Sequence, residues 1–198
     1  MKFSDREIKE LIHAGILISL AFSILLSGGY KLFSFDIDFI IVFFISFFTA
    51  GTGFLLHELM HKYTAQRYGL WAEFRAFYPM LWLAVMFSFA GFIFAAPGAV
   101  VIKGLVNNER NGKISLAGPI TNIILAILFL ILYFIIPIKD SLILSFLDYG
   151  FKINALLAAF NMIPVMPFDG AKVIAWHKGV YFITLVVAVG LVTLSWIN

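Results

Sequence analysis

Long apolar runs separated by short polar segments constrain the fold of this chain more than any other feature. A helix that crosses a lipid bilayer needs about 20 mostly apolar residues. Apart from residues 76–102, which are treated below, four runs are about this long, and a fifth, at 150–163, leads into a proline-containing segment. Pro137, Pro164 and Pro167 are expected to break or kink helices. The pattern predicts an all-α multi-pass membrane protein with about five transmembrane helices, at 8–28, 39–66, 115–136, 150–163 and 179–197.

The composition agrees with a membrane location. Of the 198 residues, 62% are hydrophobic and 13% are charged, whereas a soluble domain has about 25% charged residues. We expect a single integral-membrane domain over residues 1–198, with 8–28 retained as a helix and not removed as a signal peptide. The net charge of +3 suits loops beside anionic lipid and gives no reason to invoke nucleic acid. The absence of cysteine excludes disulfides and thiolate metal sites.

Residues 76–102 are long enough for a sixth span, but the charge distribution argues against one. Lys and Arg favour the cytoplasmic side, and a single crossing by 76–102 would place the basic loop 103–113 outside. A segment that enters and returns keeps this loop inside with the other basic clusters. Gly91, Pro97 and Gly98 also interrupt helix, and the surrounding residues favour strand. We predict a re-entrant, partly β membrane-dipping segment, with six spans as the alternative.

The segment "HELMH" at 57–61 places polar residues inside an apolar run. His57 and His61 are four residues apart, so they lie on one face of a helix and can share a metal ion. Glu58 is well placed beside a water on that metal, as in the H-E-x-x-H arrangement of zinc proteases. A catalytic zinc takes three protein ligands and lowers the pKa of a bound water to about 7. Glu58 can then act as general base.

The third ligand must come from another part of the chain. Asp169 is the carboxylate least expected to be simply solvated, because it follows two prolines in an apolar stretch. The helix from residue 39 to the H-E-x-x-H motif is about 30 Å long, and the run from 150 to Asp169 is roughly 29 Å, so both reach a similar depth near the inner leaflet. Asp169 could instead cap a short helix at 170–177. The other candidates are His13, His177, Glu73, Glu109, Asp140 and Asp148.

With these residues the chain resembles the site-2 protease family of intramembrane zinc metalloproteases. Three motifs match in order: "HELMH", "AGPITN" and "NMIPVMPFDG", and the resemblance covers about residues 40–178. It implies one zinc ion per chain, held by His57, His61 and Asp169, with Glu58 as the catalytic base. The usual second glycine after the aspartate is Ala171 here.

The resemblance also implies roles for two asparagines. Asn161 would donate to the developing oxyanion at the scissile carbonyl, and Asn122 would have a supporting role. The plain alternative for both is hydrogen bonding between helices. Gly118 and Pro119 are expected to start a helix. In this family, strands between the first two motifs can pair with an unwound substrate, which agrees with our interpretation of 76–102.

These observations favour an endopeptidase that cuts membrane-embedded segments of other proteins in a cell membrane. Its partners would be a transmembrane protein substrate and the lipid bilayer. The sequence does not indicate an oligomeric state. The alternative is a zinc-binding membrane protein without hydrolytic activity, such as a transporter or an inactive regulator. A transporter usually needs ionisable groups along a path through both leaflets, whereas the best candidates here cluster at one depth.

Overall fold

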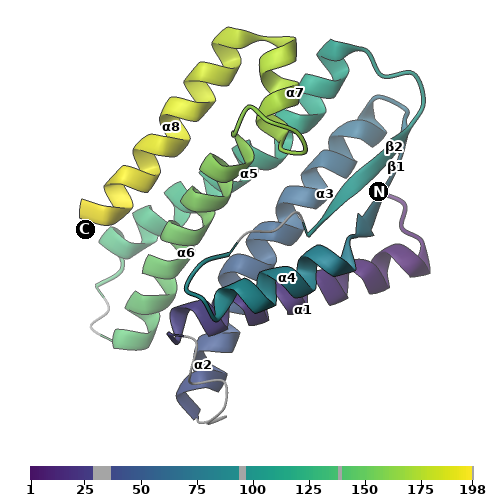
Figure 1. The fold of residues 1–198 in the computed structure, drawn as a ribbon. Coiled ribbons are helices and arrows are strands. Elements are labelled where there is room, and N and C mark those ends of the chain that lie inside the picture. Colours follow the sequence, from purple (N-terminus) through teal and green to yellow (C-terminus); the bar gives the residue numbers. More distant parts are fainter. Residues whose placement is uncertain (29–36, 94–96, 138–139, 198) are drawn as a thin grey trace. The chain divides into compact units, whose positions relative to one another are not determined.

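The computed structural model describes residues 1–28, 37–93, 97–137 and 140–197 (Figure 1). The described chain is mostly helical, with one two-stranded sheet. The helices are α1 (Asp5–Leu26), α2 (Ile37–Ser46), the π-helical turn η2 (Phe47–Gly51), α3 (Thr52–Arg67), α4 (Tyr78–Ser88), α5 (Asn108–Ile135), α6 (Ser141–Asn161), α7 (Asp169–Trp176) and α8 (Lys178–Ile197), and the strands are β1 (Trp71–Ala76) and β2 (Gly98–Lys103).

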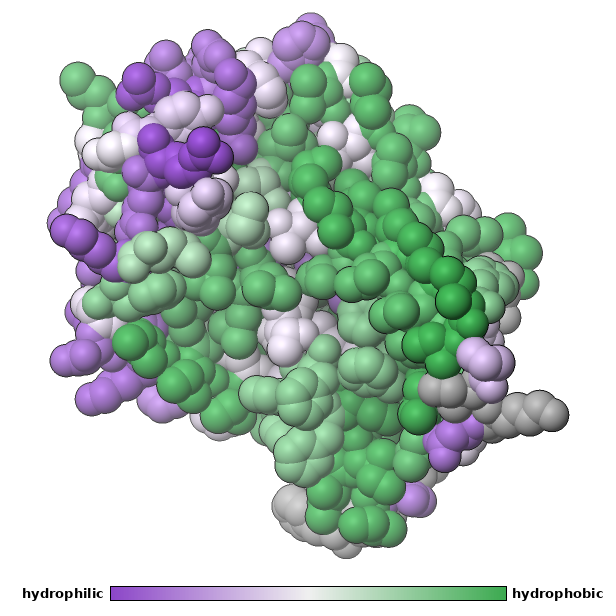
Figure 2. Space-filling view, turned by 180° about the vertical axis from the view of Figure 1, so that it is seen from behind, coloured by the Kyte–Doolittle hydropathy of each residue, from purple (hydrophilic) through white to green (hydrophobic). Residues whose placement is uncertain are grey.

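Five helical stretches of the described chain are long and apolar enough to cross a membrane. Large hydrophobic side chains are exposed along them, and hydrophobic residues cover a broad area of the face in Figure 2. The prediction of a multi-pass membrane protein is confirmed. The five stretches are Asp5–Leu26, Ile37–Arg67, Asn108–Ile135, Ser141–Asn161 and Lys178–Ile197.

The segment predicted to be re-entrant contains both helix and strand. Its helix α4 has only 11 residues, too few to cross a bilayer, so no sixth span is found among the described residues. Strand β2 lies at the end of the segment, as the β-branched residues there suggest. Strand β1 lies upstream, at Trp71–Ala76, so the predicted range missed it. Residues 94–96 lie outside the described residues, and re-entry into the membrane stays a prediction.

All five spans begin before the predicted residues, and the difference is largest for α5 and α6. Helix α5 begins at Asn108, where the side chain of Asn107 accepts a hydrogen bond from the Arg110 amide. Pro119 therefore lies inside α5, and the prediction that Gly118 and Pro119 start a helix was wrong. Helix α6 begins at Ser141 with Asp140 as its N-cap. In α5 a polar cap and a charged first turn precede the apolar residues, whereas in α6 the Asp140 cap is followed by an apolar first turn.

The chain divides into two compact units, Met1–Leu55 with Glu73–Val101, and Leu56–Ala72 with Ile102–Asn198. In the first unit, helices α1, α2 and α4 share a hydrophobic cluster. Buried small side chains let these helices approach closely. The cluster contains Ala21, Ile24, Phe39, Ala84 and Val85.

The first unit also holds most of the sheet. The amide of Phe77, just after β1, donates to the carbonyl of Pro97, just before β2, at 3.0 Å. The end of β1 thus meets the start of β2, and the two strands are antiparallel. Alternate residues of an antiparallel ladder direct their backbone groups away from the partner strand. By this register, the outward residues are Phe74 and Ala76 on β1 and Gly98 and Val100 on β2.

Carboxylates from α1 occupy the outer edge of β1. Glu7 accepts from the amide of Phe74 at 2.8 Å, and Glu10 accepts from the amide of Ala76 at 2.9 Å. Glu7 is fully buried, and Glu10 is almost so. The two acids lie one turn apart on α1, which matches the two-residue spacing of the amides that they receive.

The second unit contains the residues of the H-E-x-x-H motif together with α5, α6, α7 and α8. Small side chains lie between its long helices and let them pack closely. Ala126 and Ala155 do so in a cluster that they form with Phe151. Gly150 of α6 lies against the ring of Phe129 on α5, where an added Cβ would stand 2.5 Å from the ring. This close packing sets the spacing of the helices that frame the site described below.

Candidate metal centre

Helix α3 places the residues of the H-E-x-x-H motif in a buried position. His57 is 4% exposed, and Glu58 and His61 are each 7% exposed. The two imidazole rings lie edge to face, with centroids 4.6 Å apart. Residues four apart lie on the same face of a helix with 3.6 residues per turn, so both rings point to one side of α3.

Asp169 reaches the two histidines from the first turn of α7. Its Oδ2 lies 3.2 Å from Nε2 of His57 and 3.0 Å from Nε2 of His61. One ligand atom from each of the three residues lies within 4.8 Å of the others. The structure therefore brings together the three residues that the sequence suggested, and Asp169 is not the N-cap of α7, a position that Phe168 holds.

The far sides of both imidazoles make hydrogen bonds that direct Nε2 toward Asp169. Nδ1 of His61 donates to the backbone carbonyl of Ile114 at 2.8 Å. Nδ1 of His57 donates to Oδ1 of Asn122 at 2.6 Å. A metal-binding histidine needs this arrangement, in which one nitrogen carries the proton and the other offers a lone pair.

Gly118 of α5 forms the wall facing the two histidines. A Cβ at this position would stand 2.5 Å from Nε2 of His57 and 2.5 Å from Nε2 of His61. A side chain at this position would therefore collide with the nitrogens that face Asp169. Two imidazole nitrogens and one carboxylate oxygen form the donor set of many catalytic zinc sites, so these residues fit a zinc ion.

Lys172 makes the two oxygens of Asp169 different. Its Nζ lies 3.4 Å from Oδ1, while Oδ2 faces the histidines. A carboxylate, and not a neutral carboxyl group, is the form of this side chain that binds metal.

Glu58 lies beside this group with one unsatisfied atom. Its Oε2 is buried and has no hydrogen-bond partner among the described residues. An unpaired carboxylate oxygen in a buried site costs free energy. A water in the fourth position of a three-ligand zinc site would give this oxygen a partner, which also fits a catalytic metal centre.

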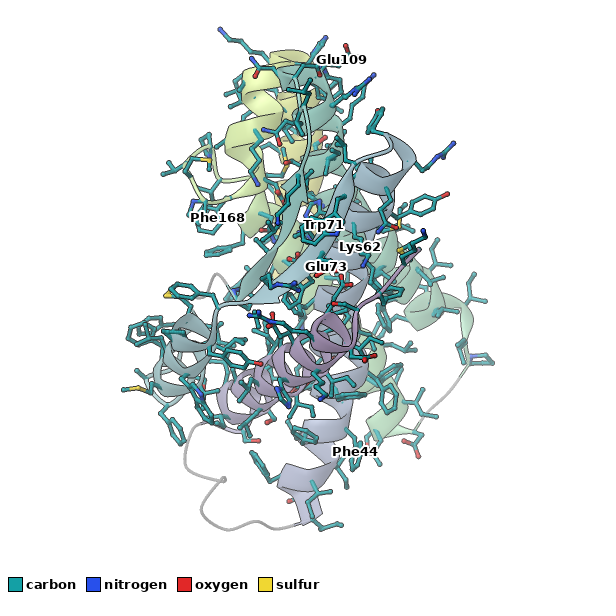
Figure 3. The ribbon with its side chains drawn as sticks, turned by 90° about the vertical axis from the view of Figure 1, so that its right-hand side faces the viewer. Phe44, Lys62, Trp71, Glu73, Glu109 and Phe168 are labelled. Atoms are coloured by element: carbon teal, nitrogen blue, oxygen red, sulfur yellow. The ribbon has the colours of Figure 1, made fainter. Side chains whose placement is uncertain are left out.

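The other candidates for the third ligand have different partners. Glu109, labelled in Figure 3, lies in the first turn of α5. Its carboxylate pairs with Lys113. None of these side chains belongs to a metal-binding group within the described part of the chain. The remaining pairs are His13 with Tyr78, His177 with Val180, Glu73 with Arg75, Asp140 with Leu142 and Asp148 with Lys152.

The two asparagines suggested by the resemblance differ in their positions. Asn122 is fully buried and hydrogen-bonds to His57 directly. Asn161 is the last residue of α6, and its Nδ2 donates to the carbonyl of Leu157 at 2.9 Å. An additional residue, Asn154, bonds to Asn122. One indication of Asn154 was present in the sequence: it is a polar residue in an apolar helix, two turns before Asn161.

Comparisons with known proteins agree with this site. Over 184 residues the chain is 45% identical to a Methanocaldococcus jannaschii protein named "Putative zinc metalloprotease MJ0611", covering 92% of this chain and 90% of that protein. It is also 30% identical over 122 residues to "Zinc metalloprotease MJ0392" of the same organism, covering 61% of this chain and 30% of that protein.

The fold and the site together define a class of protein: a multi-pass helical membrane protein with a buried His-His-Asp group. The chain belongs to the zinc metalloprotease family of its 45% identical relative. No protein-family model matches the chain. No solved structure matches it either.

Proposed function

We propose that the chain is an intramembrane zinc endopeptidase of the site-2 protease type. Its substrates would be transmembrane segments of other proteins. The observation that carries the proposal is the convergence of His57, His61 and Asp169, whose ligand atoms lie within 4.8 Å of one another in a chain with five potential spans. Zinc metalloprotease relatives support the same chemistry.

The chemistry is divided among a few side chains. His57, His61 and Asp169 would hold one zinc ion. A bound zinc polarises a carbonyl and lowers the pKa of a coordinated water. Glu58 takes the proton from the attacking water and passes it to the leaving amine. Its unpaired Oε2 provides the acceptor for that proton.

Asn161 is the proposed donor to the oxyanion. It ends α6, and the next residue, Met162, lies against Gly170 at the start of α7, since a Cβ on Gly170 would collide with the Met162 carbonyl. Asn161 is therefore held close to the turn that carries Asp169. A side-chain amide has two N–H groups. One donates to Leu157, and the other would serve the developing charge.

A helical substrate hides its peptide bonds in its own hydrogen bonds, so it must unwind before it is cut. We expect the unwound stretch to add as a strand to the β sheet. The outward amides of β1 are already bonded to Glu7 and Glu10. No described residue outside the sheet bonds to the outward backbone groups of Gly98 or Val100. The edge of β2 is thus the expected place for the substrate.

The test uses purified protein and a reporter containing a membrane segment. Wild type should bind one zinc per chain and cleave the reporter, while Glu58→Gln should retain zinc and lose cleavage by at least about a hundredfold, the size expected for general base catalysis. Undiminished cleavage by Glu58→Gln would remove Glu58 from the mechanism. Zinc binding without cleavage of a range of membrane reporters by wild type would favour a non-hydrolytic zinc protein.

A further inference from the structure

A chain of buried amide groups leads from the backbone of α6 to His57. His57 donates from Nδ1 to Oδ1 of Asn122 at 2.6 Å, and Nδ2 of Asn122 donates to Oδ1 of Asn154 at 3.0 Å. Nδ2 of Asn154 then donates to the backbone carbonyl of Gly150 at 2.9 Å. Both asparagines are fully buried.

The orientation of Asn122 determines which nitrogen of His57 carries the proton. In the observed orientation the amide oxygen faces Nδ1, so Nδ1 keeps its proton and Nε2 offers a lone pair toward Asp169. Turned by 180°, Asn122 would present its NH₂ group to Nδ1. The proton of a neutral imidazole would then move to Nε2, where it blocks ligation of a metal.

Asn122 cannot fix its own orientation, because the two ends of an amide have almost the same shape. Asn154 has the same ambiguity. The carbonyl of Gly150 does not, because a backbone carbonyl can only accept a hydrogen bond. Turning Asn154 would place its oxygen against that carbonyl in a dry interior, so Gly150 fixes the orientation of Asn154 and, through it, favours the observed orientation of Asn122.

We propose that Asn154 is a positioning residue that keeps His57 in its metal-binding tautomer through Asn122. The inference rests on the metal-binding role of His57 proposed above. Asn154 touches neither the ligating atoms nor a substrate, so its effect is indirect. The competing explanation is that Asn154 only joins α5 to α6 by a hydrogen bond.

The first experiment measures zinc affinity by competition with a chelator. Asn154→Leu should weaken zinc binding about tenfold, at the lower end of the effects known for residues that orient metal ligands. Thr184→Val is the matched control, since Thr184 is a buried α8 residue whose hydroxyl donates only within its own helix, to Val180. It should leave zinc affinity unchanged. Unchanged zinc affinity in folded Asn154→Leu would overturn the proposal.

A double-mutant cycle separates positioning from packing. In an Asn122→Asp background both carboxylate oxygens accept, so His57 keeps its Nδ1 proton whichever way that side chain is turned. Asn154→Leu should therefore cost much less zinc affinity in this background than in wild type. A purely structural Asn154 would give equal losses in both backgrounds, and that result would also overturn the proposal.

A measurement on the unmodified chain keeps the test decisive if Asn154→Leu does not fold. Nitrogen-15 NMR of histidine-labelled, zinc-free wild type at alkaline pH should show the proton of His57 on Nδ1. Finding it on Nε2 would overturn the inference. Failure of wild type to bind zinc at all would instead overturn the proposed function, so the two failures are distinguishable.

Discussion

Gly118 lies directly against His57, with room for a hydrogen atom but not for a methyl group. An added Cβ would stand 2.5 Å from Nε2 of His57 and equally close to Nε2 of His61. The nearest obstacles are the ligating nitrogens themselves and not the ends of flexible side chains. A wall of bare backbone is thus part of the candidate metal centre.

Gly118→Ala should therefore abolish or strongly weaken zinc binding. The methyl group would push both imidazoles off their positions, and metal sites tolerate errors in ligand distance of only about 0.2 Å. Gly190→Ala in α8 is the matched control, because a Cβ there meets nothing within 4 Å. Zinc per purified chain, determined by element analysis, gives the comparison. Full zinc content in Gly118→Ala would contradict the proposed position of the metal.

Asp169→Asn should remove zinc while keeping the size of the side chain. An amide oxygen is a weaker zinc ligand than a carboxylate, and the positive charge on zinc loses its one anionic protein ligand. We expect at least a tenfold loss of affinity, or about 1.4 kcal/mol. Asp148→Asn is the control, since Asp148 pairs with Lys152 on α6. Equal zinc affinity of Asp169→Asn and wild type would leave the site without its third ligand.

Much of this site follows from local spacing, which explains why the sequence predicted it. The i,i+4 histidines need only a helix, and Asp169 stood out as a carboxylate in an apolar segment. The chain order of the three motifs supplied the rest. The partner of Asn154 and the wall at Gly118 could not be predicted, because the first depends on how α6 packs against α5 and the second on how α5 packs against α3.

The sequence predicted the fold less accurately than the site. Apolar runs gave all five spans, but they misplaced the starts of α5, whose first turn is polar, and of α6, whose polar N-cap Asp140 lies well before the predicted run at 150–163. Strand β1 includes Glu73 and Arg75, and these charged residues left it outside the apolar segment that we predicted to contain strand. Helix α4 was not foreseen because an 11-residue apolar stretch cannot be separated from strand by periodicity alone. The role of Asn161 stays a prediction.

Glu7→Leu should destabilise the protein because it strips the Phe74 amide of its acceptor. Phe74 is 1% exposed, so water cannot replace the lost carboxylate. The expected loss is about 1–3 kcal/mol for an unsatisfied buried group, visible as a lower thermal midpoint in detergent. Glu7→Gln keeps an acceptor oxygen and should lose less. If Glu7→Leu and Glu7→Gln melt together with wild type, the hydrogen bond to β1 contributes nothing to stability.

Removing a carboxylate that caps the outer edge of β1 should let the substrate pair with β1 as well as with β2. Because the natural chain has no cysteine, single cysteines at Ala99 on β2 or at Arg75 on β1 can be cross-linked to a cysteine in the membrane reporter. In a Glu58→Gln background, which holds substrate without cutting it, the Ala99→Cys chain should cross-link and the Arg75→Cys chain should not. Adding Glu10→Ala, which removes the acceptor of the Ala76 amide, should raise cross-linking at position 75. Strong cross-linking at 75 with both caps intact would show that the substrate does not select β2.

Gly150→Ala should loosen the packing between α5 and α6 and weaken zinc binding through it. The new methyl group would meet the ring of Phe129 at 2.5 Å, and overpacking of this kind typically costs about 1–3 kcal/mol. The shift would also disturb the carbonyl that accepts from Asn154. Phe129→Leu makes room and should restore both the thermal midpoint and the zinc affinity of Gly150→Ala. If the double variant regains stability but not zinc affinity, the amide chain depends on a finer alignment of the Gly150 carbonyl than helix spacing alone provides.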